Sequence, residues 1–134
     1  MPRHYREAPL LSIWEGSGNV NALDVLRALR REPDTAQALF GELALAQGAD
    51  ARLDTAVARL KDLLVTASEA GARRLVEHMA LTLQASLLVR HAPSAIADAF
   101  CATRLGGDWG HAFGTLPDAA DLDAVLGRAL PGGY

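Results

Sequence analysis

The sequence has little cysteine, few aromatic residues and no long hydrophobic run. Cys101 is the single cysteine among 134 residues, which excludes an intrachain disulfide and a multi-cysteine zinc site. Asp, Arg, Glu or Gln interrupts each apolar stretch before it reaches the roughly 20 residues that span a bilayer. The first residues also lack the apolar run of a signal peptide. These absences favour a cytoplasmic protein with a reduced thiol, no membrane partner and no metal.

The chain also lacks an excess of positive charge. Lys and Arg together number 13 against 16 Asp and Glu, which leaves a formal net charge of −3. A basic field over the whole domain, typical of nucleic-acid-binding proteins, is therefore absent. Lys61 is the single lysine, however, so the remaining cations are arginines, which can bind phosphate through two parallel hydrogen bonds.

The residues that are abundant favour an all-α fold. Apolar residues make up 50% of the chain, Ala and Leu are frequent, and 5% of the residues are aromatic. Such a composition is typical of helices packed through small and medium aliphatic side chains. A stripe from Leu53 to Leu64 recurs every three or four residues, and the segment after Gly71 is apolar on most faces, which predicts a central helix. We expect a single-domain bundle of five or six helices, over 19–31, 34–47, 53–67, 72–89, 93–103 and 118–130, with residues 1–18 as loop and turn.

The opening segment carries the most specific pattern. Tyr5-Arg6-Glu7-Ala8 precedes Ile13-Trp14-Glu15-Gly16-Ser17-Gly18-Asn19-Val20. This order, an Arg-acid-Ala segment before an aromatic-Glu-Gly-Ser turn that opens a helix, resembles the flavin-dependent acyl-CoA dehydrogenases. The continuation Asn21–Arg27 resembles their alkylation-response (AidB-like) branch, and Phe100–Leu105 and Gly114–Leu116 are similar to its far C-terminal part.

This resemblance implies a part of a larger architecture. Residues 1–31 correspond to the end of the C-terminal helical domain of an acyl-CoA dehydrogenase, and 32–134 to a helical extension packed as one unit with it. The complete protein would bind FAD, oxidise acyl-CoA thioesters at the alpha and beta carbons, and form a homo-oligomer. The isolated chain would be inactive and would not retain FAD. The alternative is a helical DNA-associated or oligomerisation module without catalysis.

Glu15 and the residues after it are the candidate active-site residues. Glu15 corresponds to the family's catalytic glutamate, and a carboxylate in a dry pocket is a competent base. Gly16, Ser17 and Asn19 would contribute to flavin binding, because the N-terminus of a helix offers free N–H groups to a phosphate. The alternative for Ser17 and Asn19 is plain helix capping. The family often has an acidic residue and a Gln where this chain has Asn19 and Asn21.

A second candidate surface consists of arginines. The AidB-like branch is associated with double-stranded DNA, so this resemblance makes exposed arginines candidates for contacts to phosphate. Arg52 and Arg59 are seven residues apart and are expected on one exposed helix face. The alternative is ordinary solvated charge paired with nearby glutamates. The DNA candidates are Arg27, Arg30, Arg31, Arg52 and Arg59.

The remaining reactive residue types favour structural roles. Cys101 follows Phe100 on an apolar face and is expected to be a buried small hydrophobic residue. Trp14, Trp109 and Phe113 are either anchors of loops or stacking platforms for bases. We also expect Leu10, Leu11, Ile13 and Trp14 to be partly uncovered, which would promote self-association.

Overall fold

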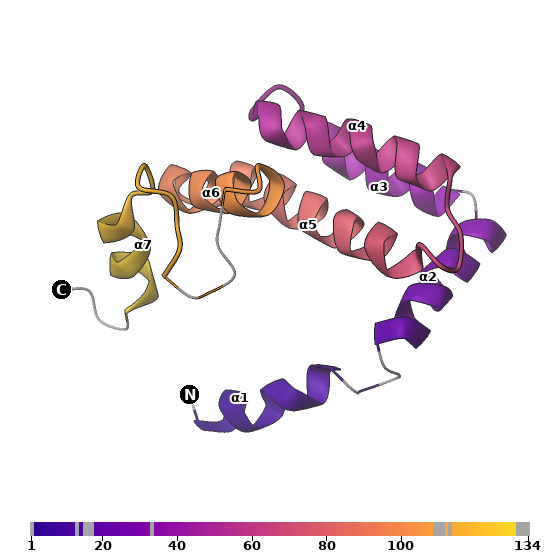
Figure 1. Ribbon diagram of the computed structural model, residues 1–134, viewed down its shortest axis with the longest axis horizontal. Helices are drawn as coiled ribbons and strands as arrows, with labels where there is room; N and C mark the ends of the chain where they lie inside the picture. The colour runs from indigo at the N-terminus through magenta and orange to yellow at the C-terminus, as the bar shows by residue number, and fades with distance from the viewer. Residues whose placement is uncertain are drawn as a thin grey trace.

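The computed structural model describes residues 2–12, 14, 18–32, 34–108, 112 and 114–130 (Figure 1). Over these residues the protein contains α-helices, one 3-10 helix (η1), one π-helix (η2) and no strand. The all-α prediction is confirmed, with seven α-helices rather than five or six. Their order is α1 (Pro2–Glu7), η1 (Ala8–Ser12), α2 (Gly18–Arg31), α3 (Asp34–Ala44), α4 (Ala51–Val65), α5 (Ala72–His91), α6 (Ser94–Phe100), η2 (Cys101–Leu105) and α7 (Leu122–Ala129).

The main error of the sequence-based prediction lies at the start of the chain. Residues 2–12, expected to be loop and turn, form α1 and η1. Pro2 does not prevent a helix because it is the first helical residue, where the missing N–H has no intrahelical partner anyway. Arg3 Nε donates to Glu7 Oε1 at 2.9 Å, an ion pair between residues four apart that supports the short helix.

The helix α5 is central, as its apolar faces predict. It contacts α2, α3, α4, α6 and η2, and Figure 1 shows it running through the middle of the molecule. Leu60 of α4 and Leu75 of α5 are 0% and 2% exposed. They share one cluster of buried residues, which is Ala22, Leu26, Leu43, Leu60, Ala72 and Leu75.

A second, smaller cluster of buried residues lies around η2. Cys101 is fully buried together with Ala46, Leu53 and Ala85, which confirms the role expected for this cysteine. The π-helix η2 ends at Gly106, whose N–H donates to Cys101 O at 2.8 Å, the bond between residues five apart that defines this type of helix.

Several helices end earlier than their apolar pattern predicts. The helix α3 ends at Ala44, and turns lead from there to Gly48, which adopts φ +79°. Asp50 then caps α4, accepting hydrogen bonds from the N–H groups of Arg52 and Leu53. The helix α4 ends at Val65, two residues before the predicted end. Among the described residues, no helix is both long enough and apolar enough to cross a membrane.

Candidate functional site

The opening motif leads into the first turn of α2. Glu15, Gly16 and Ser17, the predicted base and two of the predicted cofactor residues, lie outside the described residues. Asn19, the third cofactor candidate, is the second residue of α2. Trp14 is described and is 62% exposed. Ile13, Trp109 and Phe113 lie outside the described residues.

Arg73 places a positive charge at the start of α2. Its Nη1 donates to Asn19 Oδ1 at 3.4 Å, between the first turns of α5 and α2. A Cβ added at Gly18 would lie 3.5 Å from Arg73 Nη2, so the guanidinium group packs against the very beginning of α2. A helix N-terminus with an adjacent guanidinium suits an anion such as a phosphate.

The face of α2 lines a surface hollow of about 580 Å³, here called the α2 hollow. Arg27 is paired there with Asp24, one turn away. Arg30 and Arg31 are exposed, and neither forms an ion pair with any residue that the structure describes. Three of the five predicted DNA contacts therefore lie together. The α2 hollow is lined by Val20, Leu23, Asp24, Leu26, Arg27, Arg30, Arg31 and Glu69.

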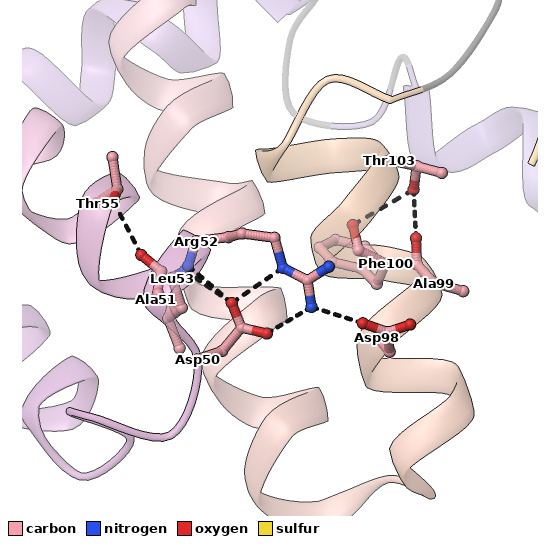
Figure 2. A network of polar contacts seen from close by, with 9 residues as sticks. All are labelled: Asp50, Ala51, Arg52, Leu53, Thr55, Asp98, Ala99, Phe100 and Thr103. Atoms are coloured by element: carbon pink, nitrogen blue, oxygen red, sulfur yellow. Dashed lines mark hydrogen bonds and ion pairs between the residues drawn. The ribbon is translucent and has the colours of Figure 1, made fainter. Parts of the chain in front are cut away.

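Arg52 is engaged within the protein rather than free on its surface (Figure 2). Its Nη2 lies 2.6 Å from Asp50 Oδ2 and 2.7 Å from Asp98 Oδ1, and its Nε donates to Asp50 Oδ1 at 3.1 Å. These bonds join the start of α4 to α6. Arg59 is exposed and has no ion-pair partner among the described residues. The two arginines expected to act together thus have different surroundings.

The electrostatics of this network favour the charged pair and a neutral thiol. The hydrogen bond from Arg52 holds the pKa of Asp50 below its ordinary value, against the opposing effect of partial burial. The hydrogen bonds to Asp50 and Asp98 raise the pKa of Arg52. Burial raises the pKa of Cys101 to about 11, with nearby Asp50 contributing. At neutral pH this thiol is protonated, so it is a poor nucleophile.

Metal-binding geometry is missing over the described part of the chain. There, no three His, Cys, Asp or Glu side chains come together as ligands for an ion. His78, for example, has its Nε2 3.0 Å from the carbonyl oxygen of Ala56, so the ring links α5 to α4.

A comparison with known proteins gives a match over most of the chain. The chain is 35% identical over 105 residues to "Putative acyl-CoA dehydrogenase AidB" of Escherichia coli (strain K12). This match confirms the resemblance to AidB-like acyl-CoA dehydrogenases. It covers 78% of this chain and 19% of AidB, so the chain spans about a fifth of the length of this relative. No family model matches the chain.

Two residues that contact predicted site residues were not recognised in the sequence. Arg73 contacts Asn19 across 54 residues of chain, and Asp98 contacts Arg52 across 46. Neither contact follows from local spacing, because the two partners lie on different helices. The single local signal was Asp50 two residues before Arg52, a spacing at which a capping carboxylate can also bind the arginine.

Proposed function

We propose that this chain is the C-terminal helical part of an AidB-like FAD flavoprotein. Residues 1–31 would end the C-terminal helical domain, and 32–134 would form the extension, in a cytoplasmic protein whose complete form oxidises acyl-CoA thioesters. The match of 35% identity to AidB over 105 residues carries this proposal. The all-α architecture supports it, because every described element is a helix, a turn or a loop.

In this proposal Glu15 is the catalytic base. Its carboxylate would take the proton from the carbon alpha to the thioester carbonyl. FAD, when bound, would accept the hydride that leaves the beta carbon, so that a carbon–carbon double bond forms. The support is the order Trp14-Glu15-Gly16-Ser17 directly before α2, which matches the family's pattern around its catalytic glutamate.

The start of α2 would contribute to the binding of FAD. Gly16, Ser17 and Asn19 are the candidates from the sequence, and Arg73 joins them because its guanidinium reaches Asn19 Oδ1. The free N–H groups of a helix N-terminus and an adjacent cation fit a phosphate. These residues form only one edge of a site, so the isolated chain would be colourless and inactive.

A chimaera tests the proposed activity. The matching part of E. coli AidB is replaced by this chain, and acyl-CoA thioesters of several lengths are added to the purified protein. We expect bound flavin that is bleached by an acyl-CoA. In Glu15→Gln we expect the rate of bleaching to fall by at least about 100-fold with the flavin content unchanged. Glu77→Gln, an exposed change on α5, is the matched control. Equal rates in Glu15→Gln and the parent would exclude Glu15 as the base.

Arg73→Ala in the same chimaera tests the cofactor edge separately. We expect weaker retention of FAD during dilution, with Arg74→Ala as the neighbouring control that does not reach Asn19. If both variants retain FAD as the parent does, Arg73 is not part of the flavin site.

The second candidate function is binding to double-stranded DNA. The observation that favours it is the gathering of Arg27, Arg30 and Arg31 in the α2 hollow, with Arg30 and Arg31 not engaged in ion pairs with described residues. We expect Arg30→Ala/Arg31→Ala to make the slope of log affinity against log salt shallower by roughly two units. Arg59→Ala would make this slope shallower by about one unit. Arg52 is held by two carboxylates, so we do not expect it to contribute a phosphate contact. An absence of DNA retention by this chain at about 50 mM salt would contradict the proposal.

A further inference from the structure

A pocket lies where three helices meet at one end of the bundle. Its volume is about 320 Å³, and it is formed by the end of α2, the beginning of α3, the end of α4 and the turn after α4. Figure 1 shows these segments converging at the same end of the molecule. The lining of this three-helix pocket consists of Leu26, Leu29, Arg30, Ala36, Leu64 and Ala67.

The apolar walls of the three-helix pocket belong to the core of this chain. Leu26 is 3% exposed and is a member of the larger buried cluster. Leu29, Leu64 and Ala67 are partly buried and pack against that cluster. Packing within one chain therefore holds these walls in place. In this respect the pocket differs from the outward face of α2, whose apolar side chains are left exposed.

Arg30 supplies the charge of this pocket. It is the one charged residue among the described residues of the lining, and it forms no ion pair with any residue that the structure describes. Asp24 and Glu69 line the neighbouring α2 hollow, but neither lines the three-helix pocket, and Asp24 is paired with Arg27. A guanidinium group thus stands beside an apolar hollow that has no carboxylate in its described lining. Its planar set of donors fits a carboxylate through two parallel hydrogen bonds.

We propose that the three-helix pocket binds a medium-chain aliphatic carboxylate, with the tail between the leucines and the carboxylate on Arg30. A volume of about 320 Å³ lies at the lower end of the range for small-molecule sites. It is roughly ten times the volume of about 30 Å³ that one water molecule takes up in the liquid. Because a methylene group is similar in size to water, a tail of roughly six to ten carbons fills the pocket.

This site is distinct from the proposed flavin edge and does not depend on the proposed function. Arg30 lies eleven residues after Asn19, which is about 16 Å along α2. The charge of Arg30 also favours a free carboxylate over a thioester of the same chain. A thioester group is uncharged, so an acyl-CoA whose chain filled the pocket would place no negative charge on the guanidinium.

Titration of the isotope-labelled chain with octanoate, followed by NMR of the backbone amides, tests this proposal. We expect a dissociation constant of about 1 mM or lower, with shifts at the amides of Ala36, Leu64 and Ala67 and none at Asn19. Each methylene added between butanoate and octanoate should lower the dissociation constant by about threefold to fourfold. Acetate, octylammonium and octanoyl-CoA should each bind this pocket at least tenfold more weakly than octanoate.

Two pairs of variants separate the charge from the cavity. Arg30→Gln should weaken the binding of octanoate at least tenfold, whereas Arg31→Gln, at the next residue and outside the pocket, should leave it unchanged. Ala36→Leu should abolish binding because the larger side chain fills the pocket, whereas Ala38→Leu, an exposed change in the same helix, should not. Far-UV circular dichroism verifies that each variant keeps the helix content of the parent.

Three outcomes overturn the proposal. The first is an absence of shifts at the pocket amides with octanoate. The second is equal binding of octanoate and octylammonium, or binding of octanoate that Arg30→Gln leaves intact, because the pocket would then be a nonselective apolar surface. The third is tighter binding of octanoyl-CoA than of octanoate at the same amides. None of these readouts depends on flavin or on catalysis, so they are independent of the proposed activity.

Discussion

The centre of the bundle buries its apolar side chains, whereas its two ends leave them exposed. In the centre, Leu60 of α4 and Leu75 of α5 are almost completely buried among α2, α3 and each other. At the ends, Leu11 of η1 is 83% exposed and Leu126 of α7 is 56% exposed. The centre therefore has a hydrophobic core of its own, whereas the ends carry apolar surface suited to contacts outside the described chain. Leucine therefore stabilises the core in one region and forms exposed apolar surface in the other.

The largest expected effect separates these two uses of leucine. Leu60→Ala should lower the free energy of unfolding by about 2 to 5 kcal/mol, because it leaves a cavity at a fully buried position. Leu126→Ala should change it by about 0.5 kcal/mol or less. Urea unfolding followed by circular dichroism measures both, at a protein concentration low enough for a monomer. Equal losses in the two variants would mean that α7 is part of the core.

The next effect tests whether η2 belongs to the centre. A Cβ at Gly106 would lie 2.7 Å from Ala102 O, so Gly106→Ala must displace backbone and should cost about 1 to 3 kcal/mol. Gly41, in α3, has open space where its Cβ would be, and is the control. An unchanged urea midpoint in Gly106→Ala would show that the turn after η2 moves independently of the core.

A smaller effect concerns the ion pairs that attach α6 to α4. Asp50→Asn keeps a capping oxygen but removes the charge that binds Arg52, and should cost about 1 kcal/mol at pH 7. The folded pKa of Asp50 is lowered, so its contribution is present above the unfolded pKa of about 3.9 and is lost as pH falls through the folded value. The difference between parent and variant should therefore shrink below about pH 4.

Asp24→Asn is the matched control for Asp50→Asn. It removes a carboxylate that is paired with Arg27 on the exposed surface of α2, where ion pairs contribute little. We expect a change of about 0.5 kcal/mol or less at every pH. A pH-independent difference for Asp50→Asn would show that its cap, rather than its charge, supports α4.

The smallest effect again compares the centre with an end. Gly41→Ala in α3 and Gly127→Ala in α7 both place a methyl group in open space and favour the helix by about 0.5 to 1 kcal/mol. We expect Gly41→Ala to raise the urea midpoint. Gly127→Ala should raise helix content and leave the midpoint unchanged, because α7 contacts α6 but adds no residue to either buried cluster.

Much of the fold follows from local spacing. The helices from α2 to α6 lie where apolar periodicity predicts them, and α5 is central because it is apolar on most faces. The beginning of the chain differs from the predicted loop and turn, because neither Pro2 nor Pro9 breaks the short helix that contains it. Pro2 opens α1, and the ion pair between Arg3 and Glu7 acts within the same short segment.

Only part of the candidate site could be predicted from local spacing. The spacing of Arg27, Arg30 and Arg31 places them on one side of α2, and the structure gathers them in one hollow. Arg52 and Arg59 were expected to act together, but spacing along one helix does not reveal the ion-pair partners that another helix supplies. Arg52 has the carboxylate of Asp98 beside it, supplied by a helix 46 residues away.

By itself, the sequence determined the helical class, the central helix, the burial of Cys101 and the resemblance to AidB-like proteins. These depend on residue type and on spacing along one helix, which are local properties. Only the tertiary structure decided which cations remain available, that Arg73 reaches Asn19, and that α7 lies far from α2. Such contacts depend on how whole helices pack against one another, and the spacing of residues within a single helix does not contain that information.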